Sequence, residues 1–258
     1  MKFLILISMI LMVVLLIGFL STLPVEKTQM QEANYQLIKH SEDLLYSVKT
    51  ESPTDFHEQA LARFLVKDLI NGLPNDAARK TFWINIYNAY YQTLAAQNLK
   101  PSKIFSKKAI RFADATFSLD DVEHGILRKY RWKYSLGYLP QWFPGNIIKQ
   151  LAVEKIDYRI HFALNCGAKS CPPIAFYTYE KIDAQLDMAT RSFLETETEF
   201  DDINKVVYAT KIMQWFKADF GGNAGIRNLL NQIFGRSFQE YKISYHDYNW
   251  QPSLKNFR

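Results

Sequence analysis

The chain has little cysteine and lacks repeated or low-complexity sequence. Only two of its 258 residues are cysteine, and neither lies near the N-terminus, which excludes a bacterial lipoprotein signal. Their C-x4-C spacing also differs from the C-x-x-C motif of thioredoxins. No long low-complexity tract indicates disorder, and no internal repeat or clear interdomain linker divides the chain. These absences favour a single globular domain.

Nucleic-acid motifs are absent as well, although the chain is basic. The formal net charge is +5, and because no nucleic-acid motif accompanies it, we expect no nucleic-acid partner. Much of the charge falls in one region, which is either a solvated face or a surface that rests on anionic lipid or another polyanion. The basic residues of this region are Lys100, Lys103, Lys107, Lys108, Arg111, Arg128, Lys129, Arg131 and Lys133.

Apolar residues are abundant, above all at the N-terminus. The chain is 48% hydrophobic and 15% aromatic, enough to bury a large core. Residues 3–20 form a predominantly apolar run that follows Lys2 and is just long enough to span a bilayer. No Ala-x-Ala-like cleavage site follows it, so we expect residues 1–22 to be an uncleaved anchor in the inner membrane, with a periplasmic domain. If the segment is instead a cleaved signal, the protein is secreted or periplasmic.

Helical patterns outnumber strand patterns. We expect residues 23–50 to be a linker running into a first helix, and residues 51–258 to be a globular domain. Apolar residues at helical spacing predict amphipathic helices over residues 54–70 and 180–197. Strands are predicted over residues 159–165, 205–210 and 243–248. Because no regular βαβ repeat occurs, the predicted class is α+β, a helix-rich domain with a small sheet.

Residues 79–97 carry the strongest helical pattern. Their apolar positions cover more than half of the helix circumference, which predicts burial on most sides. Asn85 and Asn88 lie in a narrow polar stripe, and a buried asparagine must find hydrogen-bond partners. These two side chains either line a cleft or hold a neighbouring loop by binding its backbone. In both cases we expect them to meet polar atoms of the cysteine loop.

A second helix is predicted to begin after Ser118, with acidic residues in its first turn. Glu123 and His124 lie just inside this helix. A lone histidine is more often structural than catalytic, but this pair is the best acid–base candidate outside the cysteine stretch. Residues 137–145 follow as an aromatic loop, which we expect to form part of a rim or lid.

Residues 159–174, RIHFALNCGAKSCPPI, contain both cysteines. Residues 159–165 alternate like a half-buried strand, which would place His161 and Asn165 on the same face. The chain then enters a short loop, where Gly167 allows a tight path and two prolines stiffen the exit. A loop with two thiols builds either a reactive site or a disulfide-stapled turn.

Four separated motifs together resemble the domain of unknown function 547 family. They are FWINIYNAYYQTLA, EHGILR, RIHFALNCGAKSCPPI and WFKADFG, in the family's order across residues 78–221. The closing YNW at residues 248–250 departs from the family's usual YDW. The resemblance implies the fold and the location of a site more than its chemistry. The functional positions that it implies are Asn85, Asn88, Glu123, His124, His161, Cys166 and Cys171.

Three functions fit these residues. The first is a thiol-dependent hydrolase or acyl transferase of papain-like or transglutaminase-like layout, with a cysteine nucleophile and a histidine base. Against it, papain-like enzymes seat their cysteine at a helix N-terminus, whereas both cysteines here follow a predicted strand. The second is a non-catalytic periplasmic binding or scaffolding module with a Cys166–Cys171 disulfide. The third is a redox or metal site.

The candidate residues and partners follow from these alternatives. The candidate catalytic residues are Cys166, Cys171, His124, His161 and Glu123, and the candidate binding or orienting residues are Asn85, Asn88 and Asn165. No metal ligand set and no cofactor are predicted. Besides the membrane, the expected partner is an unknown protein or small-molecule ligand.

Overall fold

The computed structural model describes residues 25–97 and 99–257, and the predicted anchor at residues 1–22 lies outside this part of the chain. Its helices are α2 (Val25–Lys49), α3 (Asp55–Leu61), α4 (Val66–Gly72), α5 (Asp76–Ala95), α6 (Pro101–Ser106), α7 (Asn146–Leu151), α8 (Ile182–Glu197), α9 (Lys211–Trp215) and α10 (Gly222–Phe234). Shorter helical segments are the π-helix η1 (Asp121–Leu127) and the 3₁₀ helices η2 (Tyr158–Phe162) and η3 (Tyr179–Lys181). Within the described residues, no helix is both long and apolar enough to cross a bilayer.

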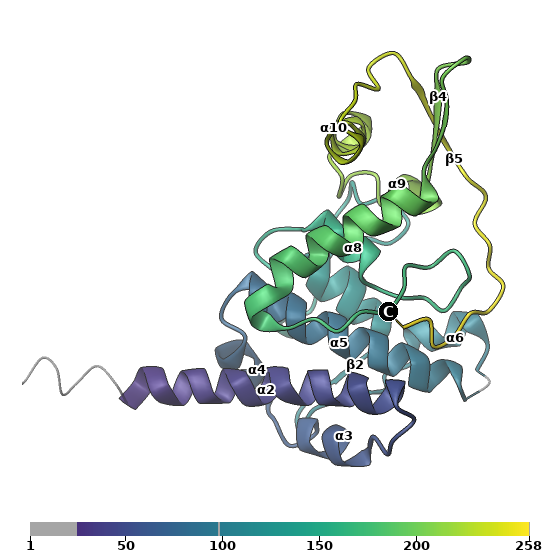
Figure 1. Ribbon diagram of the computed structural model, residues 1–258. Helices are drawn as coiled ribbons and strands as arrows, with labels where there is room; N and C mark the ends of the chain where they lie inside the picture. Colours follow the sequence, from purple (N-terminus) through teal and green to yellow (C-terminus); the bar gives the residue numbers. More distant parts are fainter. Residues whose placement is uncertain (1–24, 98, 258) are drawn as a thin grey trace, which may run out of the picture.

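Three long helices stack at the centre of the fold. α2 packs along α5, and α5 packs in turn on α8, so that the three lie one above another (Figure 1). Strands β4 (Val206–Ala209) and β5 (Lys242–Tyr245) lie with α10 at the end of the molecule away from α2 and α3 (Figure 1).

Two small sheets complete the fold. β3 (Glu199–Asp201) pairs antiparallel with β4, which pairs parallel with β5. The second sheet is the antiparallel pair β1 (Ile110–Arg111) and β2 (Thr116–Phe117). These elements confirm the predicted mixed α+β class.

Helix α5 is buried along almost its whole length, as its sequence predicts. The Asn75 side chain begins the helix by accepting a hydrogen bond from the Ala78 N–H at 3.0 Å. Aromatic and aliphatic side chains of α5 form the centre of the larger hydrophobic core. The polar residues of the stripe, Asn85 and Asn88, are fully buried within that core. Their amides therefore require protein partners, which the loops around α5 supply.

Two N-terminal segments differ from the prediction. The whole of residues 25–49 is helical as α2, without a preceding linker in the described part. Residues 54–70 form two helices, α3 and α4, rather than one. The break comes at Leu65, whose backbone is extended and whose N–H bonds to the Asp68 carboxylate at 2.7 Å. The Asp114 side chain accepts from the Val66 N–H at 2.8 Å, so a distant segment fixes the start of α4.

The predicted strand at residues 159–165 is wrong. This segment is the 3₁₀ helix η2 followed by a turn, and Asp157 caps the helix by accepting from the Arg159 N–H at 3.1 Å. η2 lies between the two hydrophobic cores: Ile160 belongs to one and Phe162 to the other. His161 is buried too. Because both sides of the segment are buried, the alternation does not separate a core face from a solvent face.

The C-terminal segment crosses the cysteine loop. After β5 the chain runs back toward α5 (Figure 1), and its backbone bonds to the loop at several points. The Lys169 N–H donates to the Gln251 carbonyl at 2.8 Å, and the Ser253 N–H donates to the Gly167 carbonyl at 2.7 Å. The Lys255 N–H reaches α5, where the Gln92 side chain accepts it at 2.9 Å. The segment therefore joins the loop to the central helix.

Candidate functional site

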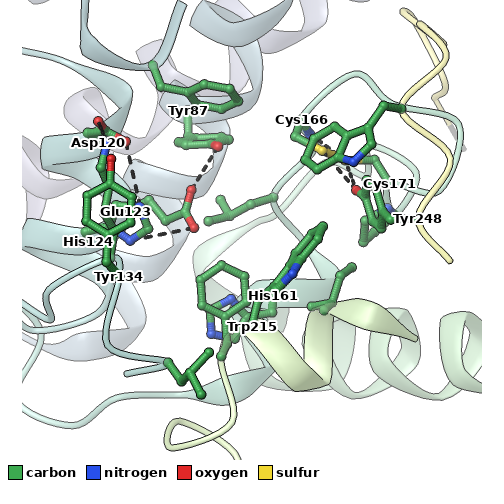
Figure 2. A pocket seen from close by; sticks show the side chains of 18 residues that line it. Tyr87, Asp120, Glu123, His124, Tyr134, His161, Cys166, Cys171, Trp215 and Tyr248 are labelled. Carbon is green, nitrogen blue, oxygen red and sulfur yellow. Dashed lines mark hydrogen bonds and ion pairs between the residues drawn. A yellow bond between two sulfur atoms is a disulfide. The ribbon is translucent and has the colours of Figure 1, made fainter. Parts of the chain in front are cut away.

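A cavity of about 490 Å³ lies where α5, η1, η2, the cysteine loop and α9 meet. Its walls are largely aromatic and aliphatic, and its polar groups are concentrated near η1 and η2. Figure 2 shows Asp120, Glu123 and His124 at one side of the cavity and Cys166, Cys171 and Tyr248 at the other. All five predicted catalytic residues line this cavity: Glu123, His124, His161, Cys166 and Cys171.

Glu123 and His124 come from the π-helix η1. Its start is fixed as predicted, since the Ser118 hydroxyl accepts from the Asp121 N–H at 3.2 Å and the Asp121 carboxylate accepts from the Ser118 N–H at 2.6 Å. The wide turn closes with the Arg128 N–H on the Glu123 carbonyl at 2.9 Å. π-Helical turns are rare and occur frequently at functional sites. Here the turn places an acid and a histidine together at one cavity wall.

Arg128 lies behind the cavity wall and positions the polar side chains at one end of the cavity. Its side chain is fully buried and donates through Nε to Asp219 Oδ2 at 2.6 Å and through Nη1 to His124 Nδ1 at 2.8 Å. His161 Nε2 lies 2.8 Å from the same Asp219 oxygen. The Phe216 ring stacks on His161 at 3.8 Å and lies under the Arg128 guanidinium at 4.6 Å. Both histidines are therefore held through one buried ion pair.

These contacts determine which nitrogens carry protons. An arginine only donates, so His124 Nδ1 accepts and the proton of the neutral ring lies on Nε2. Burial, together with the Arg128 charge, lowers the pKa of His124 to about 3. A carboxylate only accepts, so His161 donates from Nε2 and its Nδ1 keeps a lone pair in the neutral ring. Burial is the main cause that lowers the pKa of His161.

The two buried carboxyl groups are shifted in opposite directions. Burial raises the pKa of Glu123, which accepts a hydrogen bond from the Tyr87 hydroxyl at 3.0 Å. Burial would also raise the pKa of Asp219, but hydrogen bonds from His161 and Arg128 lower it overall. Asp219 is thus held as a carboxylate, whereas Glu123 is a weaker acid than usual. Perturbed titratable groups that converge on one cavity are typical of functional sites.

The opposite wall contains the two cysteines, which form a disulfide with Cα atoms 6.0 Å apart. The Tyr248 hydroxyl lies 3.1 Å from each sulfur. Tyr248 packs against Trp215 and Trp250, with ring centroids 4.7 and 4.6 Å away. The disulfide and this aromatic cluster together form an apolar wall.

Asn165 holds the cysteine loop to α5. Asn88 accepts from the Asn165 N–H and donates to the Ala163 carbonyl, each at 2.9 Å. The Asn165 side chain accepts from the Gly167 N–H at 2.9 Å and donates to the Pro172 carbonyl at 2.6 Å. The predicted contact with the cysteine loop itself is not made directly: Asn88 pairs with the backbone of Ala163 and Asn165, which precede the loop. Asn85 instead pairs with both backbone groups of Tyr177, just beyond the loop.

Comparison with protein families identifies the central part of the chain. Residues 71–194 match the family described as "Protein of unknown function, DUF547". These residues form a DUF547 domain. The match confirms the resemblance of the first three motifs, which lie inside the matched region. No curated protein and no solved structure matches the chain.

The DUF547 domain supplies only part of the cavity. Of the residues that line it, Glu123, His124, His161 and both cysteines lie within the matched region, whereas Trp215, Tyr248 and Trp250 follow it. Asp219, the partner of His161, also follows it. The C-terminal residues therefore complete a site that the domain begins.

The structure divides the predicted residues into two groups. The five candidate catalytic residues line the cavity, but their catalytic roles stay predictions, because both sulfurs are bonded to each other and the histidines pair with Arg128 and Asp219. Asn85, Asn88 and Asn165 act behind the cavity wall by holding backbone. No helix begins directly after Cys171 among the described residues, so the papain-like seating of a nucleophile is not reproduced.

The sequence does not identify Arg128, Asp219, Tyr87 or Tyr248 as residues of the site. Two of these were within reach, because Arg128 ends the EHGILR motif one turn after His124 and Asp219 lies in WFKADFG. Their pairing joins segments 91 residues apart and is visible only in the folded chain.

Proposed function

We propose that the protein is a binding module whose cavity holds a small molecule with an apolar or aromatic body and one hydrogen-bonding group. The observation that carries this proposal is the shape of the site: an aromatic cavity of about 490 Å³ with buried Glu123 and His124 at one side. Ligand pockets are typically apolar cavities of this size with a few convergent polar groups. In this proposal the Cys166–Cys171 disulfide shapes the wall and takes no part in chemistry.

The polar end determines how a ligand would be oriented. His124 offers an Nε2–H donor, because Arg128 occupies its Nδ1. Glu123 has one oxygen on Tyr87, and its other oxygen is 3.8 Å from His124 Nδ1, beyond hydrogen-bond length. A ligand hydroxyl, amide or amine that meets both side chains would be held by a donor and an acceptor at once. Its apolar part would then extend toward Trp215 and Tyr248.

The test uses the purified full chain and three aromatic probes that differ in their polar group: phenol, indole and 3-phenylpropionamide. We expect saturable shifts in the NMR signals of Trp215 and Trp250. Replacing Trp215 with alanine removes part of the aromatic wall and should weaken binding about tenfold. The matched variant Trp142→Ala removes an exposed tryptophan that does not line the cavity and should leave affinity unchanged. If none of the probes binds, or both variants behave alike, the proposal fails.

A second candidate function is thiol chemistry after reduction of the disulfide. The observation in its favour is the buried His161–Asp219 pair, which resembles the base and orienting acid of a catalytic triad. His161 lines the same cavity as the cysteines. Reduction would supply the thiol that such a mechanism needs.

Alkylation rates distinguish this second candidate. The full chain, reduced with dithiothreitol, would be treated with iodoacetamide over a range of pH, and modified Cys166 and Cys171 would be measured by mass spectrometry. If His161 activates a thiol, the variant His161→Gln should slow alkylation near neutral pH, whereas His246→Gln, outside the cavity, should not. Equal alkylation rates in the two variants would rule out activation of a thiol by His161, and binding would stand as the one proposed function.

A further inference from the structure

The segment from residue 130 to residue 147 exposes an unusual number of large apolar side chains. Trp142 and Phe143 are 83% and 94% exposed, and Tyr134 is 73% exposed. The other exposed apolar residues of this segment are Trp132, Leu136, Tyr138, Leu139 and Ile147. Soluble proteins rarely expose contiguous apolar surface of this kind unless it binds something.

Backbone hydrogen bonds close the segment on itself and join it to the rest of the protein. The Trp132 N–H donates to the Leu139 carbonyl at 2.9 Å, and the Gln141 N–H donates to the Tyr130 carbonyl at 2.6 Å, which closes a short hairpin. The Leu136 carbonyl accepts from the Ala218 N–H at 3.0 Å. We call residues 130–143 the aromatic hairpin. Its exposed side chains are thus presented by a fixed backbone.

The charged residues within this part of the sequence are all basic. No aspartate or glutamate occurs from residue 124 to residue 153, whereas five basic residues do: Arg128, Lys129, Arg131, Lys133 and Lys149. Arg128 is buried against Asp219, and Lys133 bonds to Asp120 at 2.7 Å. Lys149 is exposed. Two of the five charges are thus paired with acids, and Lys129, Arg131 and Lys149 supply the positive charge beside the exposed apolar residues.

We propose that the aromatic hairpin docks on a bilayer that contains anionic lipid. Tryptophan and tyrosine favour the headgroup region, because an apolar ring and a polar N–H or O–H are both accommodated there. Lysine and arginine beside them are attracted to anionic headgroups. Three residues of the hairpin, Lys133, Tyr134 and Leu136, also line the cavity, so docking brings one cavity wall to the bilayer.

The experiment measures contact between this hairpin and lipid in the full chain, independently of any other membrane attachment. The chain is reconstituted in phosphatidylcholine vesicles that contain brominated phosphatidylcholine, with or without phosphatidylglycerol. Bromine quenches only tryptophans that reach the bilayer. We expect quenching that is stronger with phosphatidylglycerol, that is lost in Trp132→Phe/Trp142→Phe, and that persists in Trp250→Phe, whose tryptophan is 63% exposed but lies outside the hairpin.

A second pair of variants tests the docking itself. Tyr138→Ser/Phe143→Ser keeps both hairpin tryptophans as reporters but removes two exposed rings, and it should reduce their quenching. The matched control Phe56→Ser/Ile203→Ser removes side chains that are 70% and 93% exposed elsewhere, and it should quench like the natural chain. Absence of quenching, as expected if the hairpin binds a protein or a second copy instead, overturns the proposal. Quenching that survives loss of both hairpin tryptophans, or that ignores phosphatidylglycerol, also overturns it.

Discussion

Arg128 is a charged residue that the fold has buried completely, and the protonation of its neighbours depends on it. It pairs with Asp219 and at the same time occupies one nitrogen of His124. An unpaired buried charge costs several kcal/mol, so this residue requires the Asp219 carboxylate as its partner. His124 is consequently kept neutral, with its remaining N–H available in the cavity.

The neutral state of His124 has a consequence for stability at low pH. Its pKa is lowered to about 3 in the folded protein by burial and by Arg128, whereas an unfolded histidine titrates near 6.5. The unfolded chain therefore binds more protons between these pH values, and the free energy of unfolding falls as the pH is lowered. For this group the slope approaches about 1.4 kcal/mol per pH unit.

Chemical denaturation of the natural chain and of His124→Gln at pH 4, 5 and 6 measures this contribution. Glutamine can still accept from Arg128 but does not titrate, so the variant should lose about 1 kcal/mol less per pH unit. The variant His246→Gln, at a site outside the cavity, serves as control and should follow the natural chain. Parallel curves for the natural chain and His124→Gln would contradict the assignment.

Asn88 provides a second prediction at this scale. It bonds to two backbone groups of the segment before the cysteine loop, in a fully buried position. Replacing it with leucine leaves the Asn165 N–H and the Ala163 carbonyl unpaired and should lower the free energy of unfolding by about 1–3 kcal/mol. Hydrogen exchange at residues 163–167 should accelerate. The same substitution at the exposed Asn228 of α10 should change neither measurement.

At the scale of the elements, Gly137 brings the backbone of the aromatic hairpin against the buried Arg128–Asp219 ion pair. This glycine has φ of +85°, and a Cβ placed there would lie 2.4 Å from Asp219 Oδ1 and 2.9 Å from Arg128 Nη2. Any side chain would strain the backbone and displace the pair. A change at Gly137 of the hairpin would therefore also displace the Arg128–Asp219 pair at the polar end of the cavity.

Two glycine variants test this connection. Gly137→Ala should lower the free energy of unfolding by about 1–3 kcal/mol. Gly145→Ala is the matched control, because a Cβ at that position would meet nothing within 4 Å. It should stay within about 0.5 kcal/mol of the natural chain. If the two variants unfold at the same denaturant concentration, Gly137 is not in contact with the ion pair.

The observed helices and strands show which elements the sequence pattern predicts correctly and which it does not. The strong helical pattern of residues 79–97 predicts α5 and its buried asparagines correctly, because burial on most sides leaves a clear periodic signal. The alternation at residues 159–165 fails, since a short segment between two cores is buried on both sides whatever its backbone conformation. The break at Leu65 combines a local bond to Asp68 with the contact between Val66 and Asp114, which lies 49 residues further along the chain than Leu65 and is not indicated by the local sequence.

The same distinction between local sequence signals and long-range contacts applies to the candidate site. Its cysteines and histidines could be selected from the sequence, because the chain has only two cysteines and five histidines, and Glu123 could be selected because it stands beside His124. The contacts of Asp219 and Tyr248 could not be predicted, although Asp219 lies in a recognised motif, since only the fold brings Asp219 to His161 and Tyr248 to the two sulfurs. The protonation of His124 and His161 depends on those same long-range contacts.

At the scale of the whole molecule, the N-terminal sequence determines where in the cell we expect the cavity to lie. The apolar run at residues 3–20 follows Lys2 and precedes no Ala-x-Ala-like site. We therefore propose that residues 1–22 anchor the chain with Lys2 in the cytoplasm and the domain in the periplasm. Such an anchor would hold the aromatic hairpin near a bilayer surface at high local concentration.

Reporter fusions after Arg258 test this topology. Alkaline phosphatase becomes active only in an oxidising periplasm, so its fusion should be active, whereas a green fluorescent protein fusion that matures only in the cytoplasm should be dark. Deleting residues 3–20 should reverse both results, because the chain would then stay inside. The disulfide supplies an independent readout in the same cells: Cys166 and Cys171 should resist alkylation in the natural chain and become reactive after the deletion, since the cytoplasm keeps thiols reduced. If the green fluorescent protein fusion to the natural chain is fluorescent, the domain lies in the cytoplasm, and the proposed topology is wrong.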